Sequence, residues 1–444
     1  MSRLIRQALC AAIAASALSP GAGAQLLGVG PLPPVGLPVP AANLPVAGPV
    51  LQNVLGEPGA QQAISPTLDT VSGVSDAVAN SGATSLLDLR SLRLDELIRS
   101  NRATVESDGN GLPVRRGIVA VLDPDPAEMQ RALSGGFRVA ADDRNGALGM
   151  RVVSLAVPSG MSAKAGLRLL QKIAPELQAD FDHLYEPAGE VLAPVSAALA
   201  SSVAASRGRA IGMIDGGVAS HPSLAGKSIE QNGFAGAPQP TGHGTAVASL
   251  LVGSQGLFRG AAIGAELLVA DVYGGNRAAG SATTIVKALG WLAAHRPQVI
   301  NISLVGPPNK LVQRAVRIVQ SRGIEVVASV GNDGPAAPPQ YPASYPGVIA
   351  VTAVDAGGRA LPEAGKATHL DFAAPGADMA AALPGHGYTR VRGTSFAAPL
   401  AAARLLADGS PSALAAEARP GKGRIGRGIV CGTCRIDPRV VGAR

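Results

Sequence analysis

The stretch "RAIGMIDGGV", residues 209–218, begins a regular alternation of expected strands and helices. Its apolar run predicts a strand that ends at Asp215, and the glycines after it predict a loop. Because the later apolar runs lack strict alternation with polar residues, they indicate strands buried on both faces of a parallel sheet. These runs are "AELLVADV", "QVINISL", "IEVVASV" and "GVIAVTAV", residues 265–272, 298–304, 324–330 and 347–354.

Helical segments separate these strands along the chain. Strands that alternate with helices predict an α/β fold, in which a parallel sheet is sandwiched by helices. In such a fold, functional side chains gather beyond the carboxyl ends of the strands. The helical segments are "GHGTAVASLLVGS", "ATTIVKALGWLAA", "KLVQRAVRIVQSR" and the stretch after Ser395, the first three at residues 242–254, 282–294 and 310–322.

The residues before this region show a different order of expected strands and helices. Residues 117–186 read as strand, helix, strand, strand, helix and strand, which predicts a small α+β domain of ferredoxin-like type. His183 is its lone histidine, and we expect a structural role for it. Upstream, "SLLDLRSLRLDELIRSN" (85–101) carries leucines at helical spacing. A helix lying against the next domain is expected there, with a partner-binding helix as the alternative.

The N-terminal segment and the linkers complete the expected domain organisation. Arg3 and Arg6 precede an apolar stretch that ends in "AGA", which is typical of a secretory signal peptide. No later stretch is long and apolar enough to cross a membrane, so we expect a secreted or periplasmic protein without membrane contact after cleavage. The expected parts are a signal peptide (1–24), a Pro/Gly/Ala-rich flexible leader (25–84), a helical linker (85–116), the ferredoxin-like domain (117–186), a cleavable linker (187–208), the α/β domain (209–410) and a basic C-terminal tail (411–444).

The formal charge of +7 is concentrated at the two ends of the chain. Residues 1–24 carry a net charge of +2 and residues 415–444 carry +5, which leaves residues 25–414 neutral. A nucleic-acid-binding domain would show a basic surface on its folded part, and aromatic residues make up only 3% of the chain. We therefore expect no nucleic-acid partner.

Cys431 and Cys434 form the pair "CGTC" near the C-terminus, while Cys10 leaves with the signal peptide. Exported thiols oxidise, so a local disulfide is the leading interpretation. A zinc site would need two more ligands, and none is near in sequence. A thioredoxin-like motif would open a helix after a strand, whereas this pair follows a glycine-rich basic segment.

Four polar side chains follow strands or begin helices at the expected catalytic edge of the sheet. They are Asp215, His243, Asn332 and Ser395. Together they supply a carboxylate to orient an imidazole, an imidazole to accept a proton, a hydroxyl to attack and an amide to stabilise an oxyanion. This combination points to nucleophilic acyl transfer.

Each residue taken alone has an ordinary alternative. Ser395 could cap its helix, and Asp215 could cap a helix or a turn. Asn332, which stands before Asp and Gly, could be a turn residue. His243 could bind a metal, but no H-x-x-x-H or similar spacing supplies the other ligands. The conjunction of the four favours catalysis.

The segments "MIDGGV", "GHGTAVASLLVG", "ASVGNDGP" and "GTSFAAP" resemble the four signature segments of the subtilisin-like serine proteases, the subtilase family. The resemblance covers about residues 205–410, and subtilisin itself is a standard example of this catalytic logic. It extends to "INISLVG" and "YPASYPGVIAVTAVD". Residues 117–186 are similar to the propeptide that assists folding and blocks the active site in this family.

The resemblance implies a role for each matched position. Ser395 would be the nucleophile, His243 the general base and then acid, and Asp215 the partner that orients the imidazole. Asn332 would form the oxyanion hole with the Ser395 backbone N–H. The pocket for the residue before the scissile bond would be lined by Ser303, Leu304, Ser329, Val330 and Gly331. A stretch near Gly280 and Ser281 would offer a strand edge to the substrate backbone.

The sequence also departs from the family pattern. Gly216 stands where Ser or Thr commonly follows the aspartate, and Leu400 replaces a frequent histidine; neither changes the expected chemistry. Val305 replaces a usual glycine in the pocket wall, which leaves the substrate preference open. Pro399 lacks an N–H and cannot bond back to the Ser395 carbonyl, so the first turn of the helix should loosen or bend.

The expected function is that of a secreted serine endopeptidase, made as a zymogen that cuts itself and that acts through an Asp-His-Ser triad and an acyl-enzyme. Its partners would be polypeptide substrates and its own propeptide as an intramolecular inhibitor. The chemistry requires no cofactor or metal; structural calcium is known in relatives but is not readable from this sequence. The alternatives are a catalytically silent scaffold with the same fold, and a serine esterase, whose G-x-S-x-G motif is not matched by "GTSFA".

Overall fold

The structure is a computed structural model that describes residues 85–189, 208–385 and 387–443. The expected signal peptide (1–24) and leader (25–84) lie outside the described residues, and so do residues 190–207 of the expected linker. No helix in the described part of the chain is long and apolar enough to cross a membrane.

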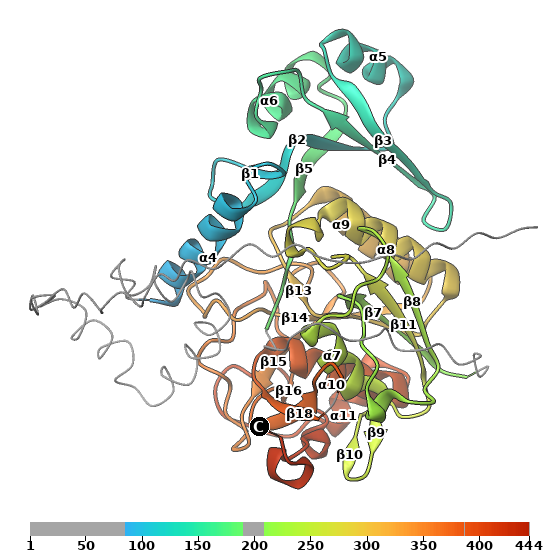
Figure 1. Cartoon of the computed structure of the whole chain (residues 1–444), viewed down its shortest axis with the longest axis vertical. Coiled ribbons are helices and arrows are strands. Elements are labelled where there is room, and N and C mark those ends of the chain that lie inside the picture. The colour runs from blue at the N-terminus through green and yellow to red at the C-terminus, as the bar shows by residue number, and fades with distance from the viewer. Residues whose placement is uncertain (1–84, 190–207, 386, 444) are drawn as a thin grey trace, which may run out of the picture. The chain divides into compact units, whose positions relative to one another are not determined.

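A seven-stranded, wholly parallel sheet forms the centre of the C-terminal region (Figure 1). Its strand order is β16-β15-β14-β12-β7-β11-β8. The strands are β7 (Ala210–Asp215), β8 (Ile229–Gly233), β11 (Glu266–Asp271), β12 (Val299–Ile302), β14 (Glu325–Ser329), β15 (Ile349–Val354) and β16 (Phe372–Pro375). The expected parallel sheet is confirmed, and the five strands read from the sequence form its centre.

Sequence reasoning missed the two strands at the edges of this sheet. β8 reads "IEQNG" and β16 reads "FAAP", so neither is a long apolar run. β8 has one unpaired side, and such an edge strand tolerates polar residues. β16 is apolar and buried, but its four residues are too few to identify a strand, and its outer side bonds to the segment around Ile429.

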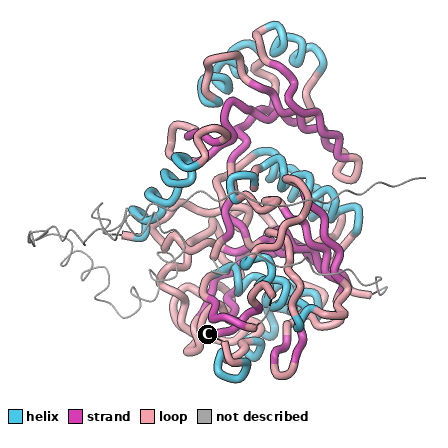
Figure 2. Tube along the Cα trace, in the orientation of Figure 1, coloured by secondary structure: helices cyan, strands magenta, loops and turns pink. Residues whose placement is uncertain are grey.

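Helices cover both faces of the sheet, as the expected sandwich requires (Figure 2). Alternate residues of a strand point to opposite faces. Met213 accordingly joins the core under α7 and α10, whereas Ile214 joins the core under α8 and α9. The helices are α7 (Gly242–Val252), α8 (Ala282–His295), α9 (Lys310–Ser321) and α10 (Thr394–Asp408).

The N-terminal α+β region has the expected order of elements. Its antiparallel sheet runs β5-β2-β4-β3, and α5 and α6 pack with a separate apolar core. The elements are β2 (Pro113–Leu122), α5 (Pro126–Ser134), β3 (Arg138–Asn145), β4 (Met150–Ala156), α6 (Ala163–Ile173) and β5 (Gln178–His183).

The segment expected to be a helical linker, residues 85–116, is more than a helix. After α4 (Leu86–Ser100), the chain forms β1 (Val105–Ser107), which pairs with the start of β2. Val105 is fully buried, and it packs against Leu184, the residue that follows β5. The expected boundary at 117 is therefore too late, because β2 begins at Pro113.

The expected basic tail, residues 411–444, is part of the α/β fold from residue 411 to at least 443. α11 (Pro411–Glu417) packs on α10, and Leu414, Val430 and Ile436 join the core on that side of the sheet. The backbone N–H of Val430 donates to the Ala373 carbonyl of β16. The boundary at 410 was wrong because the many exposed basic residues concealed the few apolar residues that anchor this segment.

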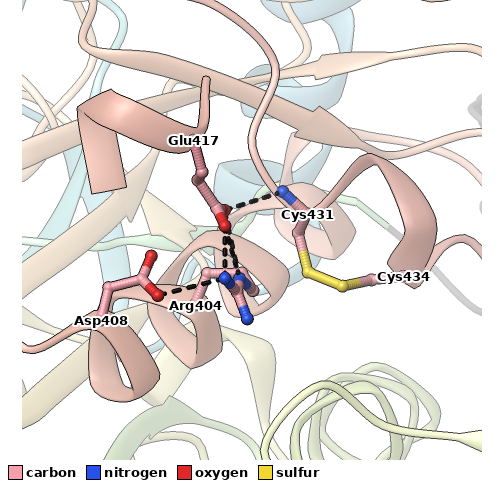
Figure 3. The surroundings of a disulfide bond; sticks show 5 residues. All are labelled: Arg404, Asp408, Glu417, Cys431 and Cys434. Atoms are coloured by element: carbon pink, nitrogen blue, oxygen red, sulfur yellow. Dashed lines mark hydrogen bonds and ion pairs between the residues drawn. A yellow bond between two sulfur atoms is a disulfide. The ribbon is translucent and has the colours of Figure 1, made fainter. Parts of the chain in front are cut away.

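A disulfide joins Cys431 and Cys434, as expected from "CGTC" (Figure 3). Beside it, the Glu417 carboxylate accepts hydrogen bonds from the Arg404 guanidinium and from the Cys431 backbone N–H. Asp408 accepts a further bond from Arg404 at 3.1 Å. This network ties α10, α11 and the C-terminal segment together.

Six short strands complete the strands of the described residues. They form hairpins or pair with segments from elsewhere in the chain, and one of them, β6, lies beside the candidate active site. They are β6 (Glu186–Pro187), β9 (Ser254–Gln255), β10 (Phe258–Arg259), β13 (Leu304–Val305), β17 (Met379–Ala382) and β18 (Tyr388–Val391).

Candidate active site

Asp215 and His243 are brought together by the end of β7 and the start of α7. The Asp215 Oδ1 and His243 Nδ1 atoms lie 2.8 Å apart, and both side chains are buried. The same carboxylate oxygen accepts the Gly216 backbone N–H at 2.7 Å. This geometry fixes the imidazole so that its other nitrogen, Nε2, points away from the carboxylate.

The glycines around His243 allow two pieces of backbone to approach closely. A β-carbon on Gly244 would collide with the Gly216 carbonyl, and one on Gly216 would collide with the Thr241 side chain. Thr241 caps α7, because its hydroxyl oxygen accepts the Gly244 N–H at 2.9 Å. The motif "GHGT" thus seats the start of α7 directly on the loop after β7.

Ser395 is the second residue of α10, and its hydroxyl donates to the Ser303 carbonyl at 3.2 Å. The N-cap position belongs to Gly393, so the capping interpretation of Ser395 is wrong. The His243 Nε2 atom is buried and has no hydrogen-bond partner among the described residues. The His243 ring packs against the ring of Phe396, the residue next to the candidate nucleophile, with 5.4 Å between the ring centroids.

Asn332 follows β14, and both ends of its amide are engaged. Its Oδ1 accepts the Thr394 backbone N–H at 3.0 Å, which orients its Nδ2 toward the Ala188 carbonyl, 2.5 Å away. The Ser395 backbone N–H donates to the same carbonyl oxygen at 3.2 Å. Two donors on different elements therefore converge on one oxygen, and the amide of Asn332 serves this site instead of a local turn.

The chain itself occupies the strand edges that the resemblance assigned to substrate. β6 pairs antiparallel with β13, and the Ala188 N–H donates to the Ser303 carbonyl at 3.0 Å. On the other side, the Tyr185 N–H donates to the Gly280 carbonyl at 2.7 Å. An extended segment of the protein thus lies between two edges, as an added strand does in peptide recognition.

Of the residues expected to line the specificity pocket, some contact the bound segment of the chain and others lie beside it or in the core. Ser303 and Leu304 contact this segment directly. Ser329 ends β14, and its buried hydroxyl has no partner among the described residues. Val330 packs in the core under α8 and α9, and the Gly331 N–H donates to the Thr394 hydroxyl at 3.1 Å.

Sequence reasoning missed Asp271, which ends β11 directly beside Asp215. Its carboxylate accepts backbone N–H groups of Gln239, Tyr273 and Gly274, which shapes the loops next to the site. Burial raises the pKa of Asp271 above its ordinary value. The available signal was an aspartate at the end of an apolar strand, the same pattern that identified Asp215.

Thr394 was also missed, although it stands inside the motif that identified Ser395. Its hydroxyl binds the Gly331 N–H and its own N–H binds Asn332, so it joins the amide loop to the start of α10. Sequence spacing could not show this role, because the two loops are far apart along the chain.

The described residues contain no group of His, Cys, Asp or Glu side chains arranged to hold a metal ion. What they contain is an aligned carboxylate and imidazole, a hydroxyl on a neighbouring helix start, and two N–H donors around a carbonyl oxygen. This arrangement can support nucleophilic attack on an amide, with stabilisation of the oxyanion.

Known proteins share this architecture. The sequence model of the Subtilase family matches residues 206–407. Subtilisin Savinase of Lederbergia lenta is 34% identical over 210 residues, which cover 46% of this chain and 77% of that protein. Thermitase of Thermoactinomyces vulgaris is 34% identical over 230 residues, which cover 49% of this chain and 82% of that protein. The crystal structure of fervidolysin from Fervidobacterium pennivorans shows a similar fold, with a TM-score of 0.59. The two chains are 18% identical, and the match covers 72% of this chain and 61% of that one.

Proposed function

The chain belongs to the subtilase family and is a subtilisin-like serine endopeptidase, and from this premise we propose that it is an exported zymogen that cuts itself at Ala188–Gly189. In this proposal Ser395 is the nucleophile, His243 the general base and acid, and Asp215 the residue that orients the imidazole. Asn332 and the Ser395 N–H form the oxyanion hole.

One observation carries the proposal. The Ala188 carbonyl oxygen accepts hydrogen bonds from both Asn332 Nδ2 and the Ser395 N–H, which is how a scissile carbonyl is held in acyl transfer. A β-carbon built on Gly189, the next residue, would lie 3.4 Å from Ser395 Oγ. The bond between these two residues is therefore beside the candidate nucleophile.

The chemical steps follow from these positions. The Ser395 hydroxyl first turns from the Ser303 carbonyl to His243 Nε2, which takes its proton as the oxygen attacks the Ala188 carbonyl carbon. The imidazolium then protonates the Gly189 amine as the C–N bond breaks. Water, deprotonated by His243, hydrolyses the Ala188 ester and regenerates the serine.

The proposal also assigns the N-terminal region as an inhibitor that remains in the cleft after cleavage. The buried Asp182 carboxylate accepts both the N–H and the hydroxyl of Thr283, at the start of α8. Asp180 accepts the Lys310 N–H at the start of α9, at 2.9 Å. A carboxylate is stabilised at a helix N-terminus by the free N–H groups and by the helix dipole. These contacts do not depend on the bond that is cut.

Intact mass and N-terminal sequencing of the purified full chain test this proposal. We expect a mature fragment that begins at Gly189 and a companion that ends at Ala188, while the Ser395→Ala chain stays uncut. A stable, uncut protein that still hydrolyses peptides would contradict the inhibitor role. Labelling by a fluorophosphonate probe separates the alternative of a silent scaffold, because only an activated serine reacts.

A further inference from the structure

A hollow of about 320 Å³ lies between the C-terminal segment and the β17–β18 hairpin, and its lining residues differ from those of the candidate active site. Three arginines line it, which are Arg390 of β18 and Arg435 and Arg439 of the C-terminal segment. We propose that this hollow binds a phosphate monoester group through the guanidinium groups of these arginines. The inference goes beyond the proposed function and does not depend on it, because no step of peptide cleavage involves these residues.

Three stretches of the chain build the hollow, and short backbone pairings hold them together. Ala356, in the turn after β15, donates its N–H to the Asp378 carboxylate at 3.1 Å, just before β17 begins. The Ala380 N–H of β17 donates to the Ile436 carbonyl at 2.9 Å, so this part of the C-terminal segment lies beside β17. Arg390 is the partner of Ala380 in the β17–β18 pairing. The backbone that carries the arginines is therefore held in place before any ligand binds.

Arg435 is positioned at the hollow by the residues around it. It directly follows the disulfide-bonded Cys434, so the closed turn between the two cysteines restricts its backbone. Its Nη1 donates to the backbone carbonyl of Asp378. A guanidinium has five N–H donors, and this bond uses one of them. A donor group that is already held in place loses less conformational entropy when it binds a ligand, so Arg435 is prepared to bind an anion.

Arg439 is matched by a carboxylate of its own. Its Nε donates to Asp437 Oδ1 at 3.1 Å, and its Nη2 donates to Asp437 Oδ2 at 2.6 Å. Hydrogen bonds from Arg439 hold the pKa of Asp437 well below its ordinary value, so this carboxylate stays ionised at neutral pH. Asp437 thus compensates the charge of Arg439, while the two bonds do not use the Nη1 group of Arg439.

Arg390 has no such carboxylate. Its guanidinium forms no hydrogen bond or ion pair with any residue in the described part of the chain. Arg392, two residues further on, is instead paired with Glu363 at 2.7 Å. The three arginines of the hollow face only two carboxylates, those of Asp378 and Asp437, which leaves a net charge of +1. Like charges gathered in one place repel each other, and a bound anion offsets this repulsion.

The number of guanidinium groups favours a phosphate monoester over other anions. A monoester has three terminal oxygens and a charge of about −1.5 to −2 at neutral pH, so it can accept hydrogen bonds from three sides. A carboxylate and a phosphodiester each offer two free oxygens and a single charge. Arginine matches such oxygens with paired N–H donors. The volume of the hollow is at the lower end of the roughly 300–1,000 Å³ of small-molecule sites, so it suits a phosphate on a small group.

Isothermal titration calorimetry with glycerol phosphate tests the proposal on the full-length chain carrying Ser395→Ala, a change made to prevent self-digestion. We expect one site per chain, and at least about tenfold weaker binding in Arg390→Ala, because charge-assisted hydrogen bonds are lost. Arg390→Lys should bind with an affinity between the two, since lysine keeps the charge but not the paired donors. Dimethyl phosphate and acetate should bind at least about tenfold more weakly than glycerol phosphate.

The pH dependence and a matched arginine separate this site from a general attraction of anions. A phosphate monoester gains its second proton near about pH 6, whereas arginine stays charged. The affinity should therefore fall as the pH is lowered from about 7.5 to about 5. Arg317→Ala is the control, because Arg317 is exposed on α9 and does not line the hollow. It should bind glycerol phosphate as the parent does, and thermal unfolding checks that each variant is folded.

The phosphate group can belong to a soluble compound or to a lipid, and cosedimentation with phosphatidylcholine vesicles distinguishes the two sources. Vesicles that also contain phosphatidic acid present a phosphate monoester, whereas those that contain phosphatidylglycerol present a diester. Arg390-dependent binding to the first vesicles and not to the second assigns the site to a lipid headgroup. Binding of glycerol phosphate without binding to either vesicle assigns it to a soluble compound.

Equal affinity of the parent and of Arg390→Ala for glycerol phosphate overturns the inference. Equal affinity of the parent for glycerol phosphate and dimethyl phosphate also overturns it, and so does the absence of binding to glycerol phosphate and to both kinds of vesicle. None of these outcomes bears on the proposed function, which self-cleavage and fluorophosphonate labelling test separately.

Discussion

Ser303 and Ser395 are joined by two hydrogen bonds that run in opposite directions. The Ser303 hydroxyl donates to the Ser395 carbonyl at 3.0 Å, and the Ser395 hydroxyl donates to the Ser303 carbonyl at 3.2 Å. The first bond satisfies a carbonyl that Pro399 cannot, because proline has no N–H to complete the helical turn. The second holds the candidate nucleophile away from His243 Nε2 until it rotates.

Loss of the proposed nucleophile and loss of one proposed oxyanion donor should lower kcat to different degrees. Asn332→Ala removes one oxyanion donor and should lower kcat by about 10²- to 10³-fold, whereas Ser395→Ala should leave almost no activity. Peptide hydrolysis and the rate of self-cleavage measure both effects. Ser321→Ala, on the exposed end of α9, serves as the control. Parent-like hydrolysis by Ser395→Ala would remove the nucleophile assignment.

Ser303→Ala should destabilise the protein. It leaves the buried Ser395 carbonyl without its donor and the Asn301 amide without its acceptor, and each unsatisfied group costs about 1–3 kcal/mol. We expect the Tm to fall by several degrees, measured calorimetrically with both chains carrying Ser395→Ala so that neither digests itself. An unchanged Tm would show that water or a shifted side chain replaces these bonds.

Arg93 should hold the cleaved N-terminal region in place. Its guanidinium bonds to Asp333, the residue after Asn332, at 3.0 Å and to Glu186, close to the proposed cleavage site, at 3.4 Å. Arg93→Ala should hasten the appearance of peptidase activity after self-cleavage by about 3- to 10-fold, because a largely buried Asp333 loses one of its partners.

Arg99→Ala is the matched control for that change. Arg99 lies on the same helix, α4, but pairs with Glu96 and is 53% exposed at its side chain. High salt should hasten activation of the parent more than that of Arg93→Ala, since it screens the bond that the variant lacks. Equal activation of all three proteins would contradict the role of Arg93.

Glu417 should stabilise the C-terminal segment in a pH-dependent way. Burial alone would raise the pKa of Glu417, but hydrogen bonds from Arg404 and the Cys431 N–H hold that pKa below its ordinary value. A lowered folded-state pKa gives stability that is present above the ordinary pKa of a glutamate and is lost as the pH falls through the lowered one.

Glu417→Gln should therefore lower the Tm at neutral pH by a few degrees, and the difference from the parent should shrink as the pH falls below about 4. Thermal unfolding of both chains in the Ser395→Ala background gives the comparison. Glu176→Gln is the control, because Glu176 is exposed and lies in the N-terminal α+β region. A difference that grows on acidification would have the wrong sign for this network.

Local patterns were sufficient for the elements around the site. Apolar runs identified the five central strands, and the segment "GHGTAVASLLVGS" indicated the helix α7 that carries His243. The same patterns failed at β8 and β16 and in the C-terminal segment, where short or polar stretches are stabilised by pairing with residues far along the chain. Sequence spacing gives no measure of such pairing, because its energy comes from burial and hydrogen bonds between distant segments.

The sequence by itself determined the parallel sheet between helices, and it determined which four side chains could supply a carboxylate, an imidazole, a hydroxyl and an amide. It did so because these features depend on residue type and local periodicity. Only the tertiary structure decided that the Ala188 carbonyl lies between Asn332 and the Ser395 N–H, that Ser303 restrains Ser395, and that Val305 reaches Gly331. These are contacts between loops brought together by the order of the strands, and their distances are set by how the whole core packs.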